Sequence, residues 1–98
     1  MNKKMTIGAP TVAQLRTYQE GCVEGPLHAL LGRLIGAPQD YTNTDSVLGE
    51  FRKTLKECKK YSAEEKEALC TALEAVMDIL RMDGSDGMLE NWRHGILL

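Results

Sequence analysis

The sequence lacks an apolar run long enough to cross a membrane, so we expect a soluble protein. A transmembrane helix needs about 20 consecutive apolar residues, whereas polar or charged residues interrupt every apolar stretch of this 98-residue chain. The first residues are basic, like the start of a signal peptide, but Gly8, Pro10 and Thr11 break the apolar run that would have to follow. We therefore expect a disordered lead-in over residues 1–10 and a single helical domain over residues 11–98.

Cysteine is scarce and lacks paired spacing, which argues against a disulfide framework. The three cysteines, Cys22, Cys58 and Cys70, form an odd number and no Cys-x-x-Cys motif. Each falls on the apolar side of a helical pattern, where a free thiol acts as a small hydrophobic side chain. We expect reduced, mostly buried cysteines in a cytoplasmic protein. Paired Cys and His ligands are also absent, so we expect no bound metal and no cofactor.

A strong excess of basic charge is missing as well. The chain carries 12 Lys and Arg residues against 14 Asp and Glu residues, for a formal net charge of -2. Proteins devoted to DNA or to anionic membranes usually carry a basic excess. The charge balance therefore argues against nucleic acid or a membrane surface as the main partner.

The alternation of apolar and polar residues that marks β-strands is absent, and every apolar series has helical spacing. A Thr-x-x-Gln capping box at Thr11 predicts a first helix over residues 12–22. Pro26 is favoured in a first helical turn and predicts the start of a second helix, which Gly36 ends.

The middle of the chain predicts a loop followed by two more helices. Residues 37–46 combine Pro, Asp, Asn, Thr and Ser, residue types that favour turns. Thr44 or Asp45 should then cap a third helix, which ends near Cys58. A Ser-x-x-Glu capping box at Ser62 opens the fourth and longest helical pattern.

The connection between the third and fourth helices is short enough to predict an antiparallel hairpin. The fourth helix alone would be only marginally stable. Its buried side chains contribute about 1.5–3 kcal/mol each, while ordering its backbone costs about 1–2 kcal/mol per residue. We therefore predict an all-α fold, a small four-helix bundle with this hairpin at its centre.

The end of the chain holds its only tryptophan, Trp92, after a Gly-rich turn. Asp86 can cap one more short turn that places Met88, Leu89 and Trp92 on a common side. We expect Leu89 and Trp92 to close one end of the bundle as a structural lid, with residues 96–98 beside them. The alternative is an exposed apolar tail that docks into a partner.

A family resemblance lies in the C-terminal third, in the stretch YSAEEKEALCTALEAVMDILRMDGSDGMLENWRHG. It resembles the C-terminal half of a family of small bacterial proteins, domain of unknown function 4844. In that family an acidic helix start leads through VMDIL to a Ser-x-Gly-x-Leu-x-x-Trp-x-x-Gly ending. The matching positions are Glu65, Glu67, Met77, Asp78, Ile79, Leu80, Ser85, Gly87, Leu89, Trp92 and Gly95. The resemblance implies an all-helical fold and no particular activity.

No motif in the sequence names a reaction or a metal. Asp83 and Ser85 start a run like a calcium-binding EF-hand loop. Met88 stands where that loop needs glycine, and His94 where it needs a bidentate glutamate. No Cys or His lies in a local catalytic motif. We therefore predict no catalytic residue and no enzyme activity.

Acidic residues on the outer face of the fourth helix form the predicted partner-binding site. These residues are Glu64, Glu67, Glu74 and Asp78. Complementary charge speeds association with a basic protein and makes it specific. We predict a non-enzymatic protein-binding module of the immunity or inhibitor type, a hypothesis based on size and class. The sequence leaves the partner and the oligomeric state open.

Two other functions stay open. The third helix carries a basic face that could meet nucleic-acid phosphates, made of Arg52, Lys53, Lys56, Lys59 and Lys60. Glu50 and Glu57 interrupt this face, so a solvated helix with ion pairs is the simpler interpretation. The third possibility is a small enzyme of unknown reaction.

Overall fold

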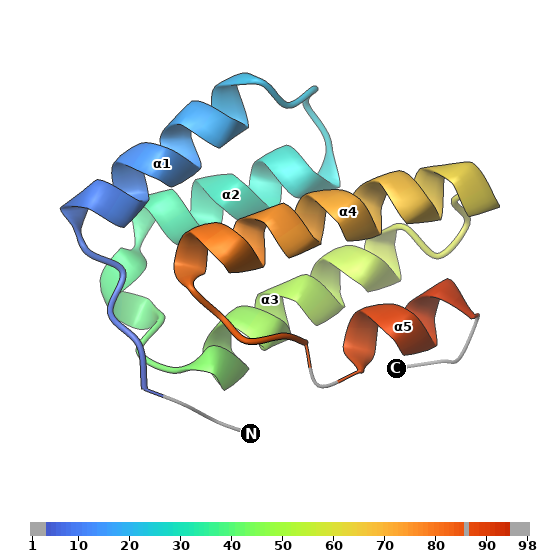
Figure 1. Cartoon of the computed structure of the whole chain (residues 1–98). Helices are drawn as coiled ribbons and strands as arrows, with labels where there is room; N and C mark the ends of the chain where they lie inside the picture. The colour runs from blue at the N-terminus through green and yellow to red at the C-terminus, as the bar shows by residue number, and fades with distance from the viewer. Residues whose placement is uncertain (1–3, 86, 95–98) are drawn as a thin grey trace.

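The computed structural model describes residues 4–85 and 87–94, and its regular elements are helices (Figure 1). In chain order these are α1 (Ala9–Glu20), α2 (Pro26–Gly36), the short 3₁₀ helix η1 (Pro38–Asp40), α3 (Thr44–Glu57), α4 (Ala63–Leu80) and α5 (Met88–Arg93). The predicted all-α fold is confirmed. The sequence prediction missed η1 inside the expected loop.

The helices pack mainly against their neighbours along the chain. α1 packs against α2 and α2 against α3, while α4 packs against both α1 and α5. α3 and α4 run in opposite directions, as the short connection predicts (Figure 1). The backbone of α4 approaches α1 and α5 more extensively than it approaches α3. A short connection fixes the direction of two helices but leaves their separation to side-chain packing.

Capping explains where α3 and α4 begin. The Ser62 hydroxyl accepts a hydrogen bond from the Glu65 backbone N–H at 3.2 Å, and the Glu65 carboxylate accepts one from the Ser62 N–H at 3.0 Å. This is the predicted capping box. The cap of α3 is Asn43, whose side chain accepts from the Ser46 N–H at 2.9 Å, rather than Thr44 or Asp45. Several adjacent residues can cap a helix, and tertiary packing selects among them.

The start of the chain differs most from the prediction. α1 begins at Ala9 after Gly8, without a side-chain cap, so the expected capping box at Thr11 does not form. Residues 4–10 are not a disordered lead-in. The Met5 N–H donates to the Thr42 carbonyl at 2.9 Å, and the Ile7 side chain is buried. Burial of the Ile7 side chain thus fixes the position of the segment that leads into α1.

One apolar core joins all the α-helices. Its fully buried members come from α1 to α4 and from Cys58 just after α3, and they include Leu15, Leu30, Leu31, Leu34, Val47, Phe51, Leu55, Cys58, Cys70, Leu73 and Val76. The three cysteines are free thiols. Cys58 and Cys70 are fully buried, as predicted, whereas Cys22 is only partly buried where α1 ends. No described helix combines the length and the apolar character that crossing a bilayer would require.

The end of α4 redirects the chain toward α5. The helix ends at Leu80, and Arg81 adopts a left-handed conformation with φ 60°. Met82 then turns inward and is buried, and its N–H donates to the Met77 carbonyl at 2.9 Å. This turn brings the following residues back along α4, so that α5 lies beside it (Figure 1).

Candidate functional site

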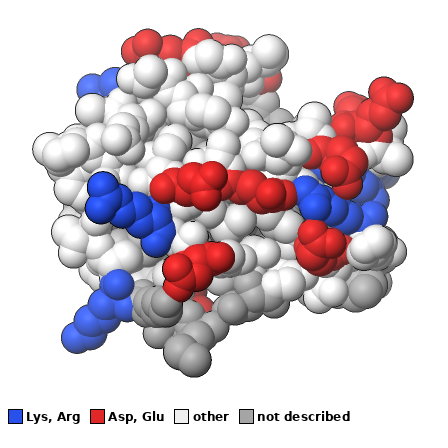
Figure 2. Space-filling model, viewed as in Figure 1, with Lys and Arg blue, Asp and Glu red and all other residues white. Residues whose placement is uncertain are grey.

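The four predicted partner-binding residues all lie on the exposed side of α4. Glu64, Glu67, Glu74 and Asp78 are each exposed to solvent. Their spacing places them along one stripe of the helix, because residues three, four or seven apart share a face. Figure 2 shows a row of acidic atoms across the middle of the viewed face, with basic atoms at both ends of it. We call these four residues the acidic stripe.

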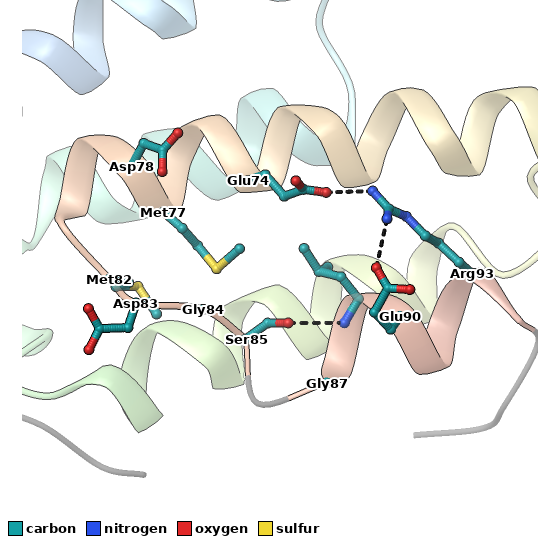
Figure 3. A pocket seen from close by; sticks show the side chains of 11 residues that line it. Glu74, Met77, Asp78, Met82, Asp83, Gly84, Ser85, Gly87, Glu90 and Arg93 are labelled. Carbon is teal, nitrogen blue, oxygen red and sulfur yellow. Dashed lines mark hydrogen bonds and ion pairs between the residues drawn. The ribbon is translucent and has the colours of Figure 1, made fainter.

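Arg93 of α5 binds two members of the acidic stripe. Its guanidinium pairs with Glu74 through Nη2, and its Nε lies 3.4 Å from Oε1 of Glu67. A third pair joins Nη1 to Glu90 Oε1 within α5, at 2.8 Å (Figure 3). Glu67 and Glu74 are therefore structural partners of α5 as well as surface residues. We call these three ion pairs the Arg93 clamp.

Sequence reasoning did not identify Arg93 as a functional residue. Its spacing from Glu90 indicates a local helical pair, but the pairs with Glu67 and Glu74 depend on how α5 docks. The Nε–H of Arg93 is buried, and none of the described residues accepts a hydrogen bond from it. Burial raises the pKa of the neighbouring Cys70 thiol, and the Arg93 guanidinium opposes that rise.

The short helix α5 is held in place by its apolar side. Leu89 and Trp92 are both buried, and their role as a structural lid stays a prediction. Lys66 of α4 stands over the Trp92 ring, with Nζ 5.3 Å from the ring centroid. The predicted cap Asp86 and residues 96–98 lie outside the described residues. The Ser85 hydroxyl accepts from the Leu89 N–H at 3.2 Å, and Gly87 supplies the left-handed φ of 84° before the helix.

A hollow of about 320 Å³ lies between α4, α5 and the segment that joins them (Figure 3). Its described lining is Glu74, Met77, Asp78, Met82, Asp83, Gly84, Ser85, Gly87, Leu89, Glu90 and Arg93. Met77, Met82 and Leu89 are buried side chains and supply apolar surface. The hollow thus combines some apolar surface with charged groups from both helices, and we call it the acidic hollow.

Among the described residues that line the acidic hollow, carboxylates outnumber cationic groups. Four of the described lining residues carry carboxylates, namely Glu74, Asp78, Asp83 and Glu90. Arg93 is the one described lining residue with a permanent positive charge. A negative concave surface raises the local concentration of cations and basic side chains. Among the described residues no group of three or more Asp, Glu, His or Cys side chains has the geometry to hold a metal ion.

The predicted basic face lies partly outside α3, because the helix ends at Glu57 and Lys59 and Lys60 follow it; its helical part is partly neutralised by Glu50. Arg52, Lys53, Lys56, Lys59 and Lys60 are all exposed. Lys53 Nζ lies 3.4 Å from Glu50 Oε1, and the other oxygen of Glu50 pairs with Arg33 of α2. Burial alone would raise the pKa of Glu50, but the hydrogen bond and the charge of Arg33 outweigh burial and lower it. This ion-pair network joins α2 to α3.

Comparison with known proteins assigns the chain to a family. A search of the curated proteins finds no match, and neither does a search of the solved structures. The family match covers residues 11–96. It therefore extends far beyond the C-terminal third in which the sequence resemblance was expected. The chain belongs to the family described as Domain of unknown function (DUF4844).

Proposed function

We propose that this chain is a non-enzymatic protein-binding module that receives a basic segment of a partner protein in the acidic hollow. The observation that carries the proposal is the excess of carboxylates over cations among the described residues that line a partly apolar hollow. Lys and Arg side chains fit such a lining, because their aliphatic stems pack on apolar surface while the charged ends reach polar groups.

The Arg93 clamp gives an example of this recognition within the chain itself. One guanidinium lies against Glu67 and Glu74 of α4 and against Glu90 of α5. Carboxylates bind guanidinium groups through directional, charge-assisted hydrogen bonds. Asp78 lies on the same stripe, lines the acidic hollow and is not part of the clamp. We propose that Asp78 is the carboxylate of the stripe that a partner engages first.

The immunity or inhibitor type is the more specific form of this proposal, with the bacterial cytoplasm as its compartment. It is supported by the small size of the chain and by three free thiols, which suit a reducing compartment. An inhibitor must capture its partner quickly. Complementary charge accelerates association more than it strengthens the final complex.

The test uses an oligoarginine peptide as the probe and amide chemical shifts as the readout. We expect the peptide to bind at low salt and to shift the amides of residues that line the acidic hollow. Asp78→Lys should weaken this binding severalfold, since it reverses a charge on the hollow without touching the clamp. The matched control is Glu24→Lys, which makes the same charge change at an exposed position between α1 and α2.

Two results would contradict the proposal. One is equal weakening by Asp78→Lys and Glu24→Lys, which would show that only net charge matters. The other is a set of shifted amides away from α4 and α5. Tight binding of duplex DNA that Lys56→Glu abolishes would instead support the nucleic-acid alternative on α3.

A further inference from the structure

α5 is the shortest of the α-helices that the structure describes. α5 spans only Met88–Arg93, and its most extensive backbone contacts are with α4. The preceding segment turns at Gly87, which has a positive φ. Segments with few tertiary contacts open at lower free energy than the whole domain.

The Arg93 clamp is exposed on its acidic side. The side chains of Glu67 and Glu90 are 64% exposed and that of Glu74 is 52% exposed. Ion pairs with exposed partners weaken as salt screens their attraction. The closed position also buries the Nε–H of Arg93, which pairs with Glu67 at 3.4 Å but donates no hydrogen bond to a described residue, whereas water would accept from this group after release.

Cys70 lies directly beneath α5. The thiol is fully buried, and its Sγ lies 4.0 Å from the carbonyl oxygen of Leu89. Cys58 is equally buried but lies just after α3, where its N–H bonds to α3 carbonyls. The two thiols therefore report on different events. Release of α5 uncovers Cys70, whereas exposure of Cys58 requires the α3 end of the core to open.

We propose that α5 is a releasable cover, which the Arg93 clamp holds closed and which opens while the rest of the fold stays intact. In the closed position the cover seals Cys70 and pairs the Arg93 guanidinium with Glu67 and Glu74. In the open position both carboxylates are available and the apolar side of α5 reaches solvent. This inference goes beyond the proposed function and does not depend on it, because it concerns the chain without a partner.

The test measures how fast iodoacetamide, a neutral reagent, modifies each cysteine of the full chain in native buffer. Peptide mass spectrometry separates the three sites, and rates in denaturant normalise their intrinsic reactivities. We expect Cys70 to react faster than Cys58. Raising the salt concentration should increase the rate at Cys70 relative to the rate at Cys58.

Arg93→Gln removes the clamp and keeps a long polar side chain. We expect it to accelerate modification of Cys70 roughly tenfold, the effect of losing three exposed ion pairs, and to change Cys58 much less. The matched control is Arg16→Gln, which removes the same charge from the exposed side of α1. It should leave both rates unchanged.

Equal normalised rates at Cys70 and Cys58 under all conditions would overturn the proposal, since α5 would then open only with the whole fold. An equal acceleration of both thiols by Arg93→Gln would also overturn it. If that variant does not fold, the salt series on the natural sequence decides between the same two outcomes.

Discussion

Replacing Trp92 with alanine tests how much the lid contributes to stability. The Trp92 side chain is 6% exposed, and a buried tryptophan typically removes about 150–250 Å² from water. At about 25 cal/mol per Å² this burial contributes roughly 4–6 kcal/mol. Measured Trp→Ala changes in protein cores cost about 3–5 kcal/mol. The total stability of a domain of this size is about 5–15 kcal/mol.

The releasable cover sets an upper limit on this loss. Once α5 has left α4, Trp92 is in water, and its truncation costs nothing further. Trp92→Ala should therefore lower the free energy of unfolding by about 3–5 kcal/mol. If releasing α5 from α4 requires less free energy than this, the loss should equal that smaller value. Adding Leu89→Ala should then cost less than it costs alone, because both substitutions weaken the same attachment.

Chemical denaturation followed by far-ultraviolet circular dichroism measures these differences without relying on the tryptophan. Leu30→Ala is the control, because Leu30 is fully buried in α2 and should show the full cost of about 2–5 kcal/mol. The reasoning would be wrong if Trp92→Ala left the midpoint unchanged and the natural chain showed the red-shifted emission of a tryptophan in water.

Three further predictions concern local contacts. Ser62→Ala should cost about 1 kcal/mol in thermal melts through loss of the capping box. Two hydrogen bonds with Ser62 lower the pKa of Glu65. The one with the Ser62 backbone has the larger effect, and the one with its side chain the smaller. The Glu65 carboxylate thus stabilises the folded chain at neutral pH, and this stabilisation is lost as the pH falls through its folded pKa. A melting series into acid should therefore show the cost of Ser62→Ala shrinking. Gly87→Ala should cost about 1–2 kcal/mol, because Gly87 has φ 84°. Gly84→Ala, where an added Cβ meets nothing within 4 Å and no positive φ applies, should cost less in the same denaturation assay. Glu50→Gln should cost about 1–2 kcal/mol through loss of the Arg33 pair, and a double-mutant cycle with Arg33→Gln isolates that pair.

Helical periodicity and capping chemistry account for the parts of the fold that the sequence predicts. The Ser62 capping box and Pro26 each mark a helix start that the structure confirms, because their effect depends on a few adjacent residues. The cap of α3 was missed by one or two positions, since Asn43, Thr44 and Asp45 all have side chains that can cap. Such a choice depends on tertiary packing around the loop.

The candidate site was only partly predictable for the same reason. The exposure of Glu67, Glu74 and Asp78 follows from their spacing on α4, and the burial of Trp92 follows from its size and surroundings. The Arg93 clamp joins residues separated by a turn whose geometry depends on the left-handed Arg81. No local pattern predicts that geometry, so neither the acidic hollow nor the pairing of α5 with the stripe could be derived from spacing alone.

The contacts of the first described residues affect where a minimal domain should be cut. The family match begins at residue 11, but Ile7 is already buried and Met5 is hydrogen-bonded to Thr42. A fragment trimmed to the matched residues would lose that bond and about 1.5–3 kcal/mol of apolar burial. It would also leave the loop before α3 without its backbone partner. Expression trials of this domain should therefore keep the chain from Lys4 onward.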